Sequence, residues 1–359
     1  MRCLTLAEYL RKEGAEVIFI CRDHPGAQHD VIMDKGFELI ILEYTERGAV
    51  NVDHEDQYKR WLAYPLETDR DQTLAAIAQL EQAVDLLIVD HYGIDAAWQG
   101  QLRRAVEKIM VIDDLANREY DCDILLDQNC HIDYKTRYDK LVPESCRKLL
   151  GLEYAMIREE FAEAREELKE RSGEINNIVI FYGGIDQTGE TLKALKAIET
   201  LARDNLTVTV IAGRGNPHFE QVAEYCRGRE NVEHLEKTGS MAKILAGADL
   251  ALGAGGSTTW ERCTVGLPSL ITAVADNQEA VSKLAETYGF GIYLGRPEET
   301  TQDNIANRIN MLMENPAVMK DISKRAGELV DGNGTRRVAE TIFELCGKPE
   351  HDTLQVSDK

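Results

Sequence analysis

One segment, residues 248–271 (ADLALGAGGSTTWERCTVGLPSLI), constrains the fold of this chain more than any other. It consists of a short apolar run, a glycine-rich turn, a stretch of helical composition and a second apolar run. Gly253, Gly255 and Gly256 allow the backbone to turn with positive φ and to approach a ligand without a Cβ clash. A strand, turn, helix and strand in this order are typical of a doubly wound α/β sheet. A glycine turn with a serine N-cap is common in α/β proteins, so the motif alone leaves a nucleotide site and a plain structural turn as equal alternatives.

The residues after the glycine turn suggest which parts of a nucleotide such a site would hold. Ser257, Thr258 and Thr259 open the expected helix, where free N–H groups and the helix dipole favour a phosphate. Glu261 lies one helical turn further on and is placed to accept hydrogen bonds from two ribose hydroxyls, as acidic residues do in dinucleotide-binding folds. The segment therefore predicts a phosphate at the helix start and a ribose near Glu261.

Composition limits the class of protein. The 359 residues suit two domains, and 41 basic against 63 acidic residues give a net charge of −22, which argues against a nucleic-acid partner. The eight cysteines include no C-x-x-C pair and no zinc-type spacing, as expected for reduced thiols in the cytoplasm. No apolar run approaches the roughly 18 residues of a membrane span. Glu8 and Arg11 stand where a signal peptide would be apolar. We expect a cytoplasmic protein.

Apolar runs alternate along the chain with amphipathic stretches such as residues 73–84 and 94–106. The continuous apolar character of these runs predicts strands buried on both faces of parallel sheets. The expected strands are residues 16–22, 37–42, 85–90, 108–113, 124–127, 177–182, 206–212, 250–253, 269–273 and 291–294.

A charged helical stretch, residues 154–169, interrupts the alternation and ends at Ser172-Gly173. We therefore expect an N-terminal Rossmann-like lobe, a linker helix, a C-terminal Rossmann-like lobe and a disordered polar tail. Their expected bounds are residues 1–155, 156–172, 173–347 and 348–359. Because ligands bind beyond the carboxyl ends of parallel strands, two such lobes are expected to face a cleft.

Polar residues and glycines follow most of the expected strands. Asp, Asn and Gly are also the usual turn residues, so each could serve the turn alone. Their recurrence at five strand ends on two lobes favours a site. These residues are Asp90, His91, Tyr92, Asp113, Asp114, Gly183, Gly184, Asp186, Gly213, Gly215, Asn277 and Gln278.

Several segments in this order resemble the UDP-sugar hydrolases of pseudaminic acid biosynthesis, from Arg2 to about Gly347. The segments are VDHYGID (residues 89–95), CDILLDQN (122–129), YAMIREEF (154–161), FYGGID (181–186), GGSTTWE (255–261) and ADNQE (275–279). That family acts on UDP-2,4-diacetamido-2,4,6-trideoxy-β-L-altropyranose. It is similar to the inverting, two-lobed glycosyltransferases of GT-B type, particularly the UDP-GlcNAc transferase of peptidoglycan synthesis, with water in place of the sugar acceptor.

The resemblance implies that the C-terminal lobe binds UDP and the N-terminal lobe lies on the side of the sugar and water. Implied nucleotide contacts are Glu261 with the ribose, and Gly256, Ser257 and Thr258 with the diphosphate, beside Gly184 of the glycine pair. Implied substrate contacts are Arg2, Arg158 and Asn277, and implied catalytic residues are Tyr92 and His91.

Plain structural roles stay open for several of these residues. Arg158 could form only a helix-surface ion pair, although a guanidinium suits a diphosphate. His91 could be a core histidine and Asn277 a helix N-cap. Asp113 and Asp114 are as well suited to turns or caps as to chemistry.

The chemistry implied by the family is attack of water at C1, opposite the UDP leaving group, with inversion. Backbone N–H groups and the helix at residues 257–260 can stabilise the leaving diphosphate without a metal. We expect no metal or other cofactor, a UDP-sugar substrate and a monomer. An inverting UDP-amino-sugar glycosyltransferase of envelope or spore-coat polysaccharide synthesis is the main alternative. A non-catalytic nucleotide-sugar-binding protein is the second alternative.

The family's base is the histidine of a glycine-x-glycine-histidine-x-x-arginine pattern, and Arg2 stands in the place of its arginine. Leu4, Ala7, Leu10 and Gly14 fit a helix at the start of the chain, where a doubly wound lobe ordinarily begins with a strand. We therefore expect that Met1 is internal to a longer protein and that the first strand and the base lie upstream of it. The chain as given is then expected to be nearly inactive, and His91 is the first candidate if it is active.

Overall fold

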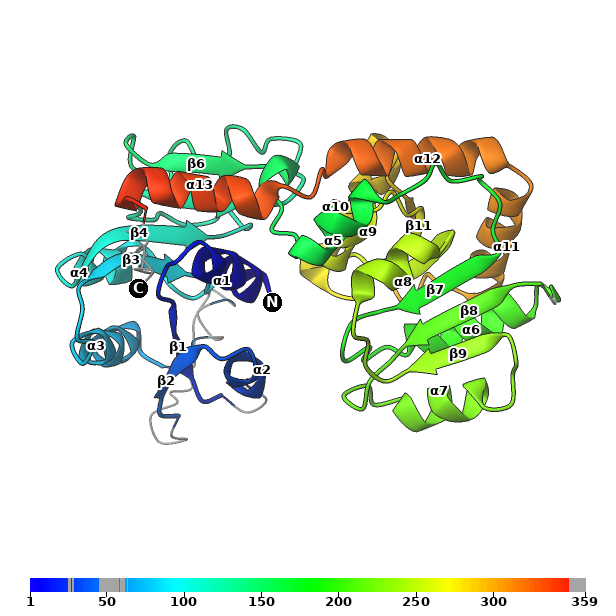
Figure 1. The fold of residues 1–359 in the computed structure, drawn as a ribbon, viewed down its shortest axis with the longest axis horizontal. Coiled ribbons are helices and arrows are strands. Elements are labelled where there is room, and N and C mark those ends of the chain that lie inside the picture. Colours follow the sequence, from blue (N-terminus) through cyan, green and yellow to red (C-terminus); the bar gives the residue numbers. More distant parts are fainter. Residues whose placement is uncertain are drawn as a thin grey trace, which may run out of the picture. The chain divides into compact units, whose positions relative to one another are not determined.

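The computed structural model describes the chain apart from residues 25–26, 28, 45–57, 59–61, 63, 204 and 349–359. It divides into two compact units, unit 1 with residues 1–156 and 335–359, and unit 2 with residues 157–334 (Figure 1). Each unit is an α/β structure with parallel strand pairs. Most of the expected disordered tail, residues 349–359, lies outside the described residues.

Unit 2 contains one six-stranded parallel sheet with the strand order β12-β11-β10-β7-β8-β9. The strands are β7 (Asn177–Phe181), β8 (Thr207–Ile211), β9 (Val232–Leu235), β10 (Leu250–Ala254), β11 (Ser269–Thr272) and β12 (Ile292–Gly295). The central strand β10 pairs with β7 on one side and β11 on the other, and Leu250 and Leu252 are fully buried. Strands β7 to β9 follow one another toward one edge of the sheet, and β10 to β12 follow one another toward the other edge. The carboxyl ends of β7 and β10 therefore form a topological switch point.

Helices of unit 2 cover this sheet, and their apolar side chains pack with those of the strands in a buried core (Figure 1). They are α5 (Glu159–Glu166), α6 (Glu190–Glu199), α7 (Phe219–Cys226), α8 (Met241–Gly247), α9 (Thr258–Thr264), α10 (Asp276–Tyr288), α11 (Gln302–Met313) and α12 (Pro316–Leu329). The stretch 156–172 is not a separate linker helix, since its helical part, α5, packs on α8 and α9 within unit 2. Phe161 of α5 is fully buried there, which explains the packing.

Unit 1 contains a two-stranded sheet and a four-stranded sheet. The first pairs β1 (Ile18–Arg22) with β2 (Glu38–Leu42), and the second has the order β3 (Val84–Val89), β4 (Val106–Ile112), β5 (Ile124–Asp127) and β6 (Arg147–Leu150). The helices are α1 (Arg2–Lys12), α2 (His29–Asp34), α3 (Leu66–Ile77) and α4 (Ala96–Leu102), with a 3-10 turn at Leu152–Tyr154. The expected first helix is present as α1, with Leu4, Ala7 and Leu10 buried and Gly14 at φ 96° just beyond its end.

The last helix, α13 (Gly334–Cys346), belongs to unit 1 and not to the C-terminal lobe in which residues 173–347 were expected. Val338, Ala339 and Ile342 are buried in one apolar cluster with α1 and the strands β4, β5 and β6. Figure 1 shows α13 beside β6, where Arg147 also pairs with Glu344 at 2.7 Å. An amphipathic helix takes the apolar surface that it can cover, irrespective of its position in the sequence.

Candidate functional site

The glycine turn of unit 2 lies at the carboxyl end of the central strand β10. A Cβ on Gly253 would lie 2.4 Å from Arg262 Nη1 and 2.6 Å from the backbone oxygen of Phe181, and a Cβ on Gly255 would lie 2.0 Å from Ser282 Oγ. The expectation of positive φ is wrong for these glycines, because none of them is in the left-handed region. Glycine is required here because neighbouring groups approach the backbone closely.

The helix α9 begins at Thr258, directly after this turn. Ser257 occupies the N-cap position, but its side chain makes no capping hydrogen bond and is exposed. Thr259 is buried, and its Oγ1 accepts a hydrogen bond from Arg262 Nη2 at 3.0 Å. The serine hydroxyl at the turn is therefore not used to cap the helix, whereas Thr259 belongs to the scaffold beneath it.

Arg158 and Glu261, named separately from the sequence, are bonded to each other. Arg158 Nε and Nη2 each lie 2.9 Å from Glu261 Oε1, and Arg158 Nη1 lies 2.6 Å from Glu160 Oε1. Burial raises the pKa of Glu261 and Arg158 opposes this effect. Arg158 thus forms the expected ion pair with Glu160 and also binds Glu261, the residue expected to contact the ribose. The arrangement fixes the Glu261 carboxylate at the first turn of α9.

The other residues of unit 2 that were expected at the site, Gly184 and Asn277, are both exposed. Gly184 is exposed after β7, with no atom within 4 Å of a Cβ built on it, so the space beside it is open. Asn277 is exposed in the first turn of α10, and the capping alternative is wrong because Ala275 holds the N-cap position. Its neighbour Gln278 reaches the turn instead. Gln278 Oε1 accepts a hydrogen bond from the Val274 backbone N at 3.1 Å, and its Nε2 would lie 3.5 Å from a Cβ on Gly256.

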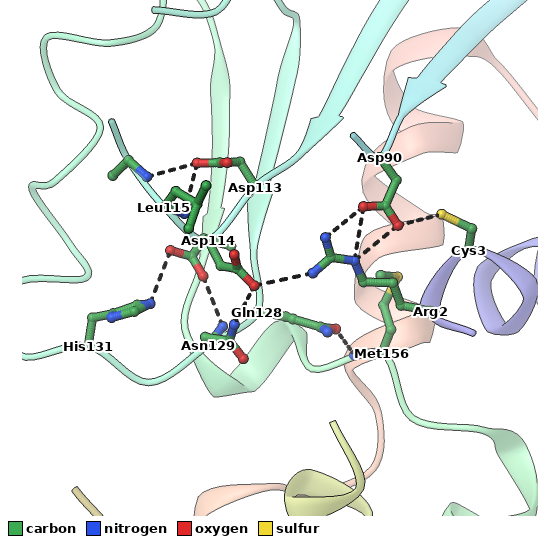
Figure 2. A network of polar contacts seen from close by, with 12 residues as sticks. Arg2, Cys3, Asp90, Asp113, Asp114, Leu115, Gln128, Asn129, His131 and Met156 are labelled. Atoms are coloured by element: carbon green, nitrogen blue, oxygen red, sulfur yellow. Dashed lines mark hydrogen bonds and ion pairs between the residues drawn. The ribbon is translucent and has the colours of Figure 1, made fainter. Parts of the chain in front are cut away.

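In unit 1, Arg2 joins two strand ends (Figure 2). Its Nη2 lies 2.6 Å from Asp90 Oδ1, after β3, and its Nη1 lies 3.4 Å from Asp114 Oδ2, after β4. Asn129 Nδ2 donates to the same Asp114 oxygen at 2.8 Å, and Cys3 Sγ lies 3.0 Å from Asp90 Oδ2. Although burial opposes ionisation, the hydrogen bonds from Arg2 hold the pKa of Asp90 below its ordinary value. Arg2 is therefore already bound to two carboxylates of its own unit.

A second set of polar groups lies deeper in unit 1. Tyr138 Oη lies 2.8 Å from Asp113 Oδ2 and 3.2 Å from Asp127 Oδ2, and Arg137 Nη1 donates to Asp127 Oδ2 at 3.0 Å. Burial raises the pKa of Asp127 to about 7, against the opposing charge of Arg137. Burial also lowers the pKa of His131, whose Nε2 lies 3.7 Å from Asp127 Oδ2, to about 4. Near neutral pH the His131 ring is therefore neutral, and Asp127 is close to the midpoint of its titration.

Asp113 stabilises the turn after β4, which agrees with the structural role left open for it in the sequence analysis. Asp113 Oδ2 accepts hydrogen bonds from the backbone N of Leu115 at 3.1 Å and of Ala116 at 2.9 Å. Sequence reasoning passed over Tyr138, Arg137 and His131. The one signal for them is that they follow the strand-ending Asp127 within eleven residues.

Tyr92 and His91 follow β3 in the turn next to this network. The Arg2 guanidinium carbon lies 5.9 Å from the centre of the Tyr92 ring, and burial, with the nearby charge of Asp114, raises the pKa of Tyr92. His91 Nδ1 accepts a hydrogen bond from the Gly93 backbone N at 3.0 Å. Because Nδ1 is an acceptor, a neutral His91 ring carries its proton on Nε2. The Nε2 atom of neutral His91 is therefore a hydrogen-bond donor. It cannot act as a base, because it already carries the proton.

Two further properties concern the described residues alone. No group of three or more His, Cys, Asp and Glu side chains among them is arranged to hold a metal ion. None of their helices is both long enough and apolar enough to cross a membrane.

Comparison with known proteins gives distant relatives. The spore coat polysaccharide biosynthesis protein SpsG of Bacillus subtilis is 24% identical over 308 residues, 85% of this chain and 89% of that protein. The UDP-2,4-diacetamido-2,4,6-trideoxy-beta-L-altropyranose hydrolase of Campylobacter jejuni is 25% identical over 187 residues, 51% of this chain and 65% of that protein. The UDP-N-acetylglucosamine–N-acetylmuramyl-(pentapeptide) pyrophosphoryl-undecaprenol N-acetylglucosamine transferase of Hahella chejuensis is 33% identical over 111 residues, 30% of this chain and 31% of that protein. No family model matches the chain.

Solved structures resemble the chain over nearly its whole length. The crystal structure of MurG from Acinetobacter baumannii has a TM-score of 0.63 at 14% identity and covers 96% of this chain and 95% of its own. CalG4, the calicheamicin glycosyltransferase, has a TM-score of 0.61 at 14% identity and covers 97% of this chain and 95% of its own. Identities this low establish the fold alone. The chain therefore has the two-unit α/β fold of GT-B type that its sequence predicts.

Proposed function

We propose that this protein is an enzyme that cleaves the bond between UDP and the anomeric carbon of a UDP-linked amino sugar. The observation that carries the proposal is the arrangement in unit 2, where a glycine turn ends the central strand and Glu261, held by Arg158, follows on α9. The names of the relatives support it, since one is a UDP-sugar hydrolase and another a UDP-sugar transferase.

Nucleotide recognition is assigned to unit 2. Glu261 accepts hydrogen bonds from the ribose hydroxyls, for which its carboxylate is held in place by Arg158. The backbone N–H groups of Gly256 and Ser257, with the hydroxyls of the exposed Ser257 and the partly buried Thr258, bind the diphosphate. Gly184 lies at the end of the neighbouring strand and leaves space open for the ligand, while Asn277 is exposed and able to contact it.

Arg158 has a second role in this scheme. Its guanidinium bonds Glu261 and Glu160, and two of its nitrogens share a single oxygen of Glu261. A phosphate could replace Glu160 as the partner of Nη1 while Nε and Nη2 keep Glu261 in place, because a planar guanidinium binds both anions well. Arg158 thus links occupancy of the ribose site to occupancy of the diphosphate site.

The reaction that we propose is hydrolysis, with UDP-2,4-diacetamido-2,4,6-trideoxy-β-L-altropyranose as the substrate. Water attacks C1 opposite the leaving UDP, the C1–O bond breaks, the configuration inverts, and the attacking water loses its second proton to solvent. The electron pair of the broken bond stays on the diphosphate, where backbone N–H groups stabilise the developing charge. Tyr92 and His91 are assigned to the sugar. The tautomer of His91 makes it a hydrogen-bond donor to a sugar oxygen rather than the base that activates water.

Transfer to a sugar acceptor is the second candidate, and one observation favours it specifically. The transferase of Hahella chejuensis has the highest identity of the three relatives, 33%, over the segment of about a third of the chain that it matches. Hydrolases and transferases share nucleotide recognition and differ in the nucleophile. Nothing in unit 2 separates the two reactions.

A proton NMR time course with the diacetamido-trideoxy UDP-sugar tests the proposal. Hydrolysis predicts equimolar UDP and free sugar, with the first-formed anomer inverted relative to the substrate. Release of UDP only after an acceptor sugar is added would replace hydrolysis by transfer. An unchanged substrate together with UDP binding would leave a nucleotide-sugar-binding protein. Absence of UDP binding in calorimetry would contradict the proposed function as a whole.

A further inference from the structure

Among the residues that the structure describes, Arg262 has the largest of the fully buried side chains, with 2% of its surface exposed. It follows Glu261 on α9 and points beneath the glycine turn. Its Nη2 donates to the Ala254 backbone oxygen at 2.9 Å and to Thr259 Oγ1 at 3.0 Å. Gly253 has room for the guanidinium only because it lacks a Cβ, which would lie 2.4 Å from Nη1. A cationic side chain therefore ties the last residue of β10 to the first turn of α9.

This buried cation lacks a carboxylate partner of its own. Among the described residues, no carboxylate oxygen lies within 4.0 Å of an Arg262 nitrogen. The Nε atom of Arg262 also has no hydrogen-bond acceptor there. The adjacent Glu261 is bonded to Arg158. Burial lowers the pKa of Arg262 to about 10, which leaves the guanidinium charged at neutral pH. An unbalanced charge in an apolar interior is costly unless an opposite charge comes close.

A second buried polar atom lies at the same strand end. Ser282 Oγ, on α10, also has no hydrogen-bond partner within the described residues and would lie 2.0 Å from a Cβ on Gly255. Polar atoms are normally satisfied when they are buried. Two unsatisfied ones under a single turn therefore indicate a turn built to receive a ligand above it, at a cost in stability when the ligand is absent.

We propose that Arg262 is a positioning residue that fixes the glycine turn and supplies, from beneath it, the charge that a bound diphosphate balances. This inference rests on the proposed function and makes it more specific. Ribose recognition by Glu261 would be the same for uridine and UDP, whereas the Arg262 charge favours ligands in proportion to their phosphate charge. The class of ligand selected is thus a nucleoside diphosphate in preference to a nucleoside.

Calorimetric titration of UDP and uridine into the protein and two variants tests the role of the charge. Arg262→Met keeps the length and apolar volume of the side chain and removes the charge, and Arg262→Lys keeps the charge. We expect Arg262→Met to lower the affinity for UDP on the order of tenfold and to change the affinity for uridine by less than about twofold. Arg262→Lys should stay closer to the parent in its ratio of UDP to uridine affinity.

Arg171→Met is the matched control. Arg171 is also largely buried in unit 2 and donates to backbone oxygens, those of Gly266 at 2.9 Å and Val265 at 3.1 Å, but it contacts the chain before β10 and not the glycine turn. Its replacement should lower thermal stability and leave the affinity ratio unchanged. If Arg262→Met does not fold, Arg262→Gln replaces it as the uncharged variant.

The outcomes separate the inference from the function on which it rests. Equal losses of UDP and uridine affinity in Arg262→Met would make Arg262 a purely structural residue and overturn the inference, with the proposed function intact. An unchanged UDP affinity would overturn it as well. Failure of the parent protein to bind UDP would instead contradict the proposed function.

Discussion

The two units end their parallel strands with different chemistry. In unit 1, the strands β3, β4 and β5 end at aspartates, and arginines or a tyrosine bind these carboxylates. In unit 2, β7, β8 and β10 are followed by glycines, and the buried Arg262 guanidinium lies beneath the turn after β10. An edge lined with backbone N–H groups accepts an anion, whereas an edge lined with carboxylates repels one. This difference is why we propose that the diphosphate binds to unit 2 and that unit 1 contacts the sugar.

The two units also differ in their sheets. Unit 2 has one continuous sheet of six strands, whereas in the described part of unit 1 β1 pairs only with β2 and β3 pairs only with β4. The polar network around Arg2 links α1 with the ends of β3 and β4 (Figure 2). In unit 1, ion pairs of Arg2 therefore connect a helix to strand ends. In unit 2, backbone hydrogen bonds between neighbouring strands connect all six strands.

The largest effect is expected from a single methyl group at the glycine turn. Gly253→Ala places a Cβ 2.6 Å from the backbone oxygen of Phe181, which belongs to a paired strand and cannot move aside. We expect a loss of about 3 kcal/mol in the free energy of unfolding, measured by urea denaturation of the whole chain. Gly184→Ala is the control, since nothing lies within 4 Å of its added Cβ. Equal stability of both variants would contradict the close-approach argument.

The second effect concerns nucleotide recognition in unit 2. Glu261→Ala removes the proposed ribose acceptor and should weaken UDP binding by about 1.5–3 kcal/mol, as expected for a hydrogen bond to a charged group. Titration calorimetry with UDP measures the change. Glu163→Ala, an exposed position on α5, serves as the control. An affinity that is the same in Glu261→Ala and the parent would remove the ribose assignment.

The fold and the two halves of the site were predictable to different degrees. The continuous apolar run Ile124–Leu126 predicts β5 correctly, and the alternation of strands and helices predicts both α/β units. The strands β6 and β9 escaped prediction because RKLL has two exposed residues and VEHL is a partly exposed edge strand. Local composition carries no signal for a strand whose stability comes from its neighbours.

Site residues near a motif could be named, and their partners could not. Glu261 and Arg158 each stand out in the sequence, but 103 positions separate them, and only the packing of α5 on α9 brings them into contact. Arg262 adjoins Glu261 in the sequence, and the sequence analysis gave it no role. Its burial depends on the missing side chain of Gly253, which is a tertiary property.

The third effect is a pH dependence that belongs to unit 1. The pKa of Asp127 is about 7 in the folded chain against an ordinary 3.8, so the folded state holds a proton that the unfolded state releases between pH 4 and 7. This group alone makes stability fall as the pH rises through that window. His131, with its pKa of about 4 against 6.5, acts in the opposite direction, because the unfolded state binds a proton that the folded state rejects. The two slopes nearly cancel in the parent.

Asp127→Asn removes one of these slopes and exposes the other. The free energy of unfolding of this variant should rise between pH 5 and 6.5 by on the order of 1 kcal/mol per pH unit relative to the parent. Urea denaturation at several pH values measures it, with Asp139→Asn, an exposed carboxylate in the same region, as the control. Parallel stability curves for Asp127→Asn and the parent would show that Asp127 holds no proton in the folded state.

The smallest effect is expected from removal of divalent metal, and it tests how the carboxylates of unit 1 are balanced. Asp90 and Asp114 are bound by Arg2, and Asp127 by Arg137, so the cations at these strand ends are guanidinium groups of the chain itself. In unit 2, backbone N–H groups and arginine charges are available to the leaving diphosphate. EDTA should therefore change the rate of UDP release in the UDP-sugar assay by less than about twofold. A loss of activity that magnesium or manganese restores would show that the reaction needs a divalent cation. The proposal that arginines and backbone N–H groups alone balance the charges would then be wrong.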